Sequence, residues 1–140
     1  MSVSTATVPE APAVTGTAIS LRRATLVSGL VSATVTTAAA AAFHAAGVSF
    51  ELEGEMIPLL GFAQMTFLGA VIGGLLLAGL NRRSGQARRR FVQATVALTA
   101  LSCLPSVALP DDAGSQIALV FLHLLAAAII VPVLARRARS

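Results

Sequence analysis

The chain of 140 residues has little charge: only 11% of its residues are Asp, Glu, Lys or Arg, less than half of the roughly 25% usual in soluble domains. It has no Trp and no Tyr, so the aromatic belt common at membrane interfaces is missing. The single cysteine, Cys103, excludes an intramolecular disulfide and the exchange chemistry of a CxxC pair. Since 56% of the residues are hydrophobic, this composition indicates an integral membrane protein.

The basic residues outnumber the acidic ones, ten to six, which gives a formal net charge of +4, and all ten are arginines. Excess basic charge is common in nucleic-acid-binding proteins, but that function needs a basic patch on a soluble fold. Here long uncharged apolar segments separate the arginines. We therefore expect no nucleic-acid partner, and the partner that the composition predicts is the lipid bilayer.

Four apolar segments are each long enough to cross a bilayer, because about 20 helical residues span roughly 30 Å of hydrocarbon. None of them contains a charged residue. Residues 1–21, rich in Ser, Thr, Ala, Val and Pro, have no periodic apolar face and are predicted to be a disordered cytoplasmic tail. The predicted fold is all-α: a four-helix transmembrane domain over residues 22–137, arranged as an up-down bundle, with spans at about 24–46, 57–80, 91–109 and 115–135.

The arginines and the acids fall in different connections. Arginines precede the first segment, fill the connection between the second and third, and follow the fourth, whereas five of the six acids occupy the other two loops. Because positive charge in short loops favours the cytoplasmic side, we expect a multi-pass protein of the plasma (inner) membrane with both termini cytoplasmic. The residues that predict this topology are Arg22, Arg23, Arg82, Arg83, Arg88, Arg89, Arg90, Arg136, Arg137 and Arg139.

The first segment has an alternative interpretation as a cleaved signal sequence. Arg22 and Arg23 precede a weakly apolar, Ala-rich stretch that ends near His44, which is also the order of elements in a signal peptide. The segment is long for a signal peptide, and the arginine pair lacks the usual neighbours of a twin-arginine motif. An uncleaved span is therefore preferred.

Small and hydroxyl-bearing residues recur at helical spacing in three spans. Such residues let membrane helices approach closely and hydrogen-bond across the contact. We interpret them as helix-packing positions, with a water-filled path lined by the hydroxyls as the alternative. They are Ser28, Ser32 and Thr36 in the first span, Gly69 and Gly73 in the second, and Thr95, Thr99, Ser102 and Ser106 in the third.

Polar residues inside the spans are candidates for function because they are unfavourable in lipid. Gln64 lies about 9 Å into the second span and His123 about 12 Å into the fourth, both counted from the outer side, and Gln116 shares the helix face of His123. We predict a polar pocket in the outer leaflet half with His123 and Gln64 at its base. The alternative is that these two side chains only hydrogen-bond across helices. The residues expected around the mouth are His44, Glu55, Asp111 and Asp112.

Catalytic and cofactor motifs are absent from the sequence. It contains no plausible Ser–His–Asp set, no HExxH motif, no phosphate-binding glycine loop and no DxxD-type diphosphate site. A divalent metal held by His44 and the acidic loops, or a haem between the two histidines, is less favoured, so we expect no metal and no cofactor. Asp111 and Asp112, which follow Pro110, also fit a turn that leads into a helix start.

Several stretches resemble a family of small four-helix membrane proteins from high-GC bacteria, a family of unknown function. The resemblance covers about residues 22–137. It implies the four-helix architecture and no catalytic or binding residues. The stretches are His44-Ala-Ala-Gly47, Gly54-Glu55-Met-Ile-Pro58-Leu-Leu-Gly61-Phe-Ala-Gln64, Arg88-Arg-Arg-Phe91, Leu101-Ser-Cys-Leu-Pro105-Ser, Pro110-Asp-Asp112 and His123-Leu-Leu-Ala-Ala.

The sequence favours a non-enzymatic membrane module, either a structural or assembly component or a binder of small ligands through the polar pocket. Its partners would then be further copies of the chain or other membrane proteins. The alternative is a small transporter or channel that works as a homo-oligomer, for which His123 is the embedded ionisable residue. A metal-binding protein or membrane enzyme is the third hypothesis, and it requires His44 and His123 to converge with the acidic loop.

Overall fold

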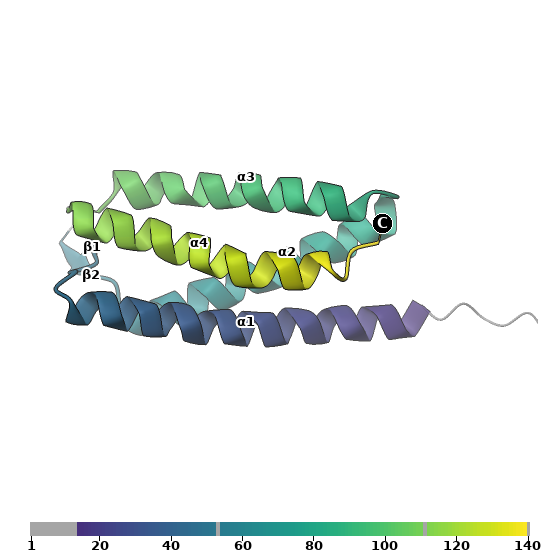
Figure 1. The fold of residues 1–140 in the computed structure, drawn as a ribbon, viewed down its shortest axis with the longest axis horizontal. Helices are drawn as coiled ribbons and strands as arrows, with labels where there is room; N and C mark the ends of the chain where they lie inside the picture. Colours follow the sequence, from purple (N-terminus) through teal and green to yellow (C-terminus); the bar gives the residue numbers. More distant parts are fainter. Residues whose placement is uncertain (1–13, 53, 111, 140) are drawn as a thin grey trace, which may run out of the picture.

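The computed structural model describes residues 14–52, 54–110 and 112–139. This part of the chain is all-α apart from one small hairpin, which confirms the all-α, four-helix part of the predicted fold (Figure 1). The sequence analysis does not predict the hairpin, whose two strands pair antiparallel between the first two helices. The elements are α1 (Val14–Ala45), β1 (Glu51–Leu52), β2 (Glu55–Met56), α2 (Leu59–Arg83), α3 (Ala87–Ala108) and α4 (Ala113–Ala135).

Each of the four helices is long and apolar enough to cross a membrane. The shortest, α3, has 22 residues and is therefore about 33 Å long, slightly more than the roughly 30 Å of hydrocarbon in a bilayer. Large apolar side chains are exposed on several helices, among them Leu30, Leu60 and Leu101. Exposed apolar surface on this scale is unfavourable in water, so it suggests that lipid surrounds the bundle.

α1 begins at Val14, earlier than the start predicted for the first span. Residues 14–21, which their composition placed in a disordered tail, are therefore helical, and the rest of that predicted tail, residues 1–13, lies outside the described residues. Helix growth is cooperative, since each residue added to an existing helix gains a hydrogen bond. The packed part of α1, which includes the buried Leu21 and Ala24, provides a helix that the N-terminal turns can extend. A prediction of disorder from composition alone does not take this into account.

The four helices alternate in direction, as an up-down bundle requires (Figure 1). The loops that follow α1 and α3 lie at one end of the bundle, and the loop that follows α2 lies at the other end with the C-terminal segment. α1 packs mainly against α2 and α4, whereas α3 packs mainly against α4 and less against α2. α3 therefore lies at the edge of the bundle, with most of its surface exposed.

The interior contains two apolar clusters. One includes Leu77 of α2 and Phe91 of α3, and the other includes Phe50 and Phe62. The rings of Phe50 and Phe62 lie edge to face, with their centroids 5.1 Å apart and their planes at 62°, a favourable aromatic geometry. Phe50 thus inserts the loop after α1 into the bundle and fixes the base of the hairpin.

α1 and α2 approach each other closely at Gly74. A Cβ atom at this position would clash with the side chain of Thr25 on α1, lying 2.7 Å from Thr25 Cγ2. Farther along the same contact, the hydroxyls of Thr36 and Thr66 lie 3.0 Å apart. The hydroxyl positions predicted for packing on the first span are all buried here: Ser28, Ser32 and Thr36.

The other predicted packing positions differ in their surroundings. Gly73 faces α4, where Leu134 Cδ1 lies 3.4 Å from the place of a Cβ atom, while no described atom approaches that place at Gly69 within 4 Å. In this GxxxG pair, Gly73 thus packs inside the bundle, whereas Gly69 faces outward. On α3 the hydroxyl positions range from buried to exposed: Thr95 and Ser106 are buried, Thr99 is half-buried and Ser102 is exposed.

Candidate functional site

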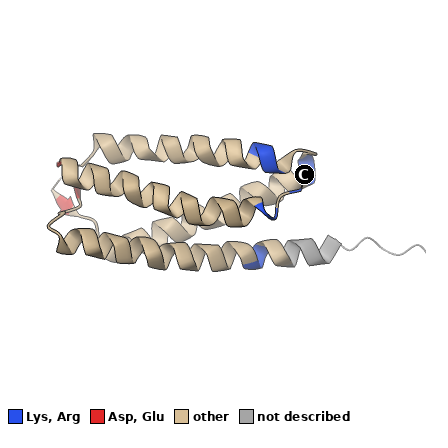
Figure 2. Ribbon diagram, viewed as in Figure 1, with Lys and Arg blue, Asp and Glu red and all other residues tan. Residues whose placement is uncertain are grey.

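Charged side chains are sorted to opposite ends of the bundle. The arginines gather toward the end that carries the loop after α2 and the C-terminal segment, and the described acids lie at the other end (Figure 2). These acids are Glu51, Glu55 and Asp112. We refer to the two ends as the arginine end and the acidic end.

At the acidic end, Asp112 caps the N-terminus of α4, the helix start that the sequence indicated. Its Oδ1 accepts a hydrogen bond from Ser115 N at 2.8 Å, and its Oδ2 accepts from the hydroxyls of Ser115 at 2.6 Å and Ser49 at 3.2 Å. A capping carboxylate satisfies a helix N–H and is favoured by the positive end of the helix dipole. The hydrogen bond from the Ser115 hydroxyl is the main reason that the pKa of Asp112 lies below its ordinary value of 3.8.

The same network ties the loop after α1 to α4. The Ser115 hydroxyl, which is fully buried, accepts a hydrogen bond from Phe50 N at 3.0 Å. Phe50 has a φ of 51°, a left-handed conformation that is uncommon for a residue other than glycine. Its carbonyl accepts a hydrogen bond from Ile57 N. Hydrogen bonds on both sides of Phe50 therefore hold this backbone conformation and the hairpin that follows it.

Two other residues predicted at the mouth of the polar pocket, His44 and Glu55, do not take part in this network. His44, exposed in the last turn of α1, has its Nδ1 3.1 Å from Val48 O, and Nδ1 is the donor because a carbonyl only accepts. Glu55 is exposed on β2, and Asp111 lies outside the described residues. Within residues 14–52, 54–110 and 112–139, no group of three His, Cys, Asp or Glu side chains is placed to hold a metal ion.

His123 is half-buried close to the midpoint of α4. Its Nδ1 donates to Leu119 O at 2.8 Å and lies 3.4 Å from the hydroxyl of Ser106 on α3. The Ser106 hydroxyl donates to Ser102 O at 3.3 Å, so it accepts from the histidine only by sharing the single Nδ1–H with Leu119 O. His123 therefore joins α4 to α3 beside Pro105, which lies inside α3 and has no N–H for the helix.

The two glutamines predicted near His123 have other surroundings. Gln116 Nε2 donates to Pro110 O at 3.3 Å, in the loop before α4. Gln64 is exposed on α2 and makes no hydrogen bond to another described residue. In the described part of the chain, no side-chain hydrogen bond joins two of the residues predicted to form the polar pocket, although Gln116 N donates to Asp112 O at 3.1 Å in the first turn of α4.

At the arginine end, Asn81 near the end of α2 holds the C-terminal segment. Its Nδ2 donates to Arg137 O at 3.2 Å, and its Oδ1 accepts from Arg139 N at 2.9 Å. Arg139 O in turn accepts from Arg88 N, at the start of α3, at 3.3 Å. The backbones of three arginine-bearing segments are therefore connected, which gathers their positive side chains at one end.

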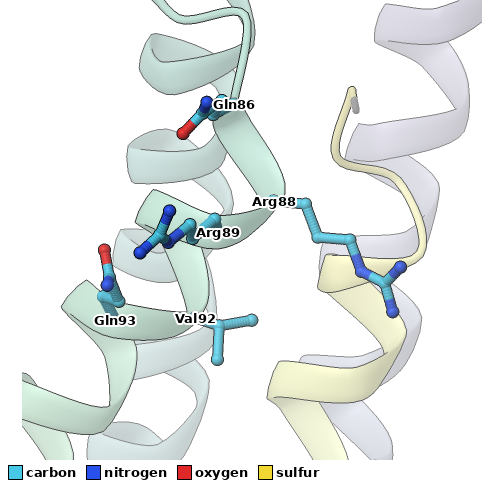
Figure 3. A pocket seen from close by; sticks show the side chains of 5 residues that line it. All are labelled: Gln86, Arg88, Arg89, Val92 and Gln93. Atoms are coloured by element: carbon cyan, nitrogen blue, oxygen red, sulfur yellow. The ribbon is translucent and has the colours of Figure 1, made fainter.

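A groove opens at the start of α3, at the arginine end. It has a volume of about 580 Å³ and is lined by Gln86, Arg88, Arg89, Val92 and Gln93. Arg88 extends from α3 toward the C-terminal segment, while Arg89 is directed to the other side (Figure 3). All ten arginine side chains of the chain are exposed, and none forms an ion pair with a described carboxylate.

Several residues that organise the two ends are not singled out by the sequence analysis. Ser115 has a local signal, because it stands three residues after a capping aspartate. Ser49 and Asn81 have none, since their partners lie 63 and 56–58 residues away in the chain. Gln86 and Gln93 become part of a groove only because α3 places them beside Arg88 and Arg89.

Comparison with known proteins supports the resemblance found in the sequence. Residues 16–140 match a family of unknown function, DUF6069. This match extends slightly, at both ends, beyond residues 22–137, the region that the resemblance covers. No curated protein and no solved structure matches the chain. Since the match covers most of its length, the chain belongs to the family of unknown function DUF6069.

Proposed function

We propose that this protein is a multi-pass protein of the inner membrane that works by binding rather than by catalysis, as a structural or assembly module. Both termini and the loop between α2 and α3 lie in the cytoplasm, and the acidic end faces the opposite side. The observation that carries this proposal is the sorting of the arginines to one end of the bundle and the described acids to the other.

The charge sorting supports the orientation for a physical reason. Arginines near short loops resist transfer across the membrane, so they bias insertion toward an arrangement that keeps them in the cytoplasm. The up-down connectivity places the arginines of α1, of the α2–α3 connection and of the C-terminal segment toward the same end (Figures 1 and 2). One orientation therefore satisfies all of these segments together.

The polar side chains are occupied in hydrogen bonds within the fold, which supports a non-enzymatic role. A catalytic group needs a functional atom aimed at a site that a substrate can share. Asp112 instead caps α4, and the Nδ1 atoms of His44 and His123 donate to backbone carbonyls. These groups hold the fold, and their separate locations also give less support to a small-ligand pocket at the acidic end than to a structural or assembly role.

Single-cysteine labelling tests the orientation. Cys103→Ala removes the single cysteine, and Glu55→Cys and Gly85→Cys then place one thiol at an exposed position of each end. In right-side-out membrane vesicles, a membrane-impermeant maleimide should label the Glu55→Cys variant, and should label the Gly85→Cys variant only after permeabilisation. The reverse pattern contradicts the orientation, and full labelling of both variants in sealed vesicles contradicts the four-span arrangement.

A small homo-oligomeric transporter or channel is the second candidate, and His123 is the observation that favours it. The side chain lies near the midpoint of a membrane-length helix, with Nδ1 bonded and Nε2 without a partner among the described residues. Ionisable side chains at this depth are frequent elements of proton pathways.

Proton flux distinguishes the two candidates. The protein is reconstituted in vesicles that contain a trapped pH-sensitive dye, and the outside solution is acidified. The module proposal expects the same rate of internal acidification as in protein-free vesicles. A faster rate contradicts it, and loss of that excess in a folded His123→Ala variant assigns the pathway to this histidine.

A further inference from the structure

We propose that the groove at the start of α3 binds the headgroup of an anionic phospholipid. Its lining combines two arginines with two amide side chains and one apolar residue: Arg88, Arg89, Gln86, Gln93 and Val92. This inference rests on the membrane-spanning arrangement of the proposed function, but it does not depend on which end faces the cytoplasm.

The positive charge at the arginine end favours an anionic ligand. A guanidinium donates paired hydrogen bonds that match the oxygens of a phosphate. Arg88 and Arg89 are exposed, and the carboxylates of the described residues lie at the acidic end, so none of them neutralises these side chains. An anionic lipid surface attracts each nearby arginine, and the amides of Gln86 and Gln93 add donors to the same groove.

The first turns of α3 hold the two arginines on a fixed backbone. Ala87 and Phe91, on either side of the pair, are fully buried. Arg88 N is hydrogen-bonded to Arg139 O, and Asn81 fixes that C-terminal segment in turn. Less ordering is required to bind a headgroup when the backbone that carries the ligands is already immobile.

An exposed apolar strip distinguishes a phospholipid from a free phosphate ion. Val92 follows Arg88 by four residues and Val96 follows Val92 by four, so the three side chains share one face of α3, about 6 Å apart along its axis. Val92 is 37% exposed and Val96 62% exposed. A phosphate held by Arg88 therefore has apolar surface directly below it, where an acyl chain of the same molecule would lie.

Lipid binding by the full-length protein in detergent tests the proposal. Phosphatidylglycerol is titrated and the bound lipid is counted by native mass spectrometry. We expect the double variant Arg88→Gln/Arg89→Gln to bind about tenfold more weakly. The matched control Arg82→Gln/Arg83→Gln removes the same charge from the same end but outside the groove, and we expect it to lose about twofold or less. An equal loss in both variants overturns the proposal, because net charge alone then explains the binding.

Two further arms identify the ligand chemistry. Phosphatidylcholine should bind more weakly than phosphatidylglycerol, and inorganic phosphate should not displace phosphatidylglycerol at equal concentration. Equal binding of the two lipids, or displacement by phosphate, overturns the anionic phospholipid as the ligand. The variant Arg88→Lys/Arg89→Lys keeps the charge but loses the paired donors of the guanidinium groups, so its affinity should lie between those of the wild type and the Gln variant. If a double variant loses helicity, the single changes Arg89→Gln and Arg83→Gln make the same comparison.

A reversed orientation in the labelling experiment would leave these expectations unchanged, so the two proposals fail separately.

Discussion

Asp112 accepts hydrogen bonds from Ser115 and Ser49, so folding favours its charged form and its pKa lies below the ordinary value of 3.8. A carboxyl group whose pKa is lowered by folding contributes stability at pH values above its ordinary pKa, and this contribution is lost as the pH falls through the pKa of the folded state. We therefore expect the thermal midpoint of the detergent-solubilised protein to fall as the pH decreases from about 5 to below 3.8.

Two variants isolate the effect of Asp112. Asp112→Asn keeps an oxygen acceptor at the N-cap but cannot ionise, so its midpoint should change less over the same pH range. Glu55→Gln removes an exposed acid that lies outside the capping network, and we expect it to follow the wild type. If wild type and Asp112→Asn lose stability in parallel, the cap is not the source of the pH dependence.

The hydrogen bond between Thr36 and Thr66 gives a second prediction for single residues. Thr36 is 1% exposed, and its hydroxyl bonds to Thr66 across the α1–α2 contact as well as to Ser32 O in its own helix. Interhelical hydrogen bonds in membrane proteins average about 0.6 kcal/mol. Thr36→Val should therefore lower the free energy of unfolding by about that amount, measured by unfolding in mixed micelles.

Thr34 provides the matched control on the same helix. Its hydroxyl donates to Leu30 O four residues earlier, as that of Thr36 does to Ser32 O, but Thr34 is exposed. Thr34→Val thus removes a bond within the helix and no bond to α2. Equal destabilisation by the two substitutions would show that the interhelical bond contributes nothing.

At the scale of whole helices, the α1–α2 contact depends on the missing side chain at Gly74. A Cβ atom there would overlap Thr25, so Gly74→Ala must push the two helices apart, and overpacking of this kind costs about 1–3 kcal/mol. Gly69→Ala is the control because that position is open among the described residues. It should be neutral or stabilising by up to about 1 kcal/mol, since Ala favours the helix. Unfolding in mixed micelles measures both, and a neutral Gly74→Ala contradicts the close contact.

The four helices themselves can be predicted from the sequence because length and hydropathy are properties of each segment alone. The observed helices overlap all four predicted spans, and they differ most at the start of α1. The hairpin cannot be predicted in this way, because it depends on contacts between distant parts of the chain. It has two residues in each strand, and its position depends on Phe50, which is held by Ser115 from a distant part of the chain.

The hydroxyl positions Ser28, Ser32 and Thr36 predict the inward face of α1, since all three are buried, but the inward faces of the other helices are not predicted in full from this sequence. In a soluble helix an apolar stripe marks the buried face, but here apolar residues surround each helix and both faces are compatible with lipid. Gln64 and His123 illustrate the consequence. The predicted spans give them similar depths, yet Gln64 is exposed near the start of α2, while His123, close to the midpoint of α4, bonds to Ser106 on α3. The rotation of each helix is set by close contacts, such as that at Gly74, which the spacing of small residues does not identify uniquely.

At the scale of the whole molecule, the two ends are built differently. The acidic end is held by a compact network in which Asp112 joins α4 to the loop after α1. The arginine end is held by hydrogen bonds between the Asn81 side chain and the backbone of the C-terminal segment, while the guanidinium groups remain exposed and available to anions. This asymmetry is the physical basis of both the proposed orientation and the proposed lipid site.

If the arginines set the orientation, neutralising the α2–α3 connection should disturb it. Changing Arg82, Arg83, Arg88, Arg89 and Arg90 together to Gln removes half of the arginines and leaves the uncharged core of each span unaltered. In the Cys103→Ala/Glu55→Cys background, the fraction labelled in right-side-out vesicles should fall, because molecules with the opposite orientation become competitive. The same five changes to Lys keep the charge and should preserve full labelling. Unchanged labelling in the Gln variant would mean that the arginines of this connection do not determine the topology.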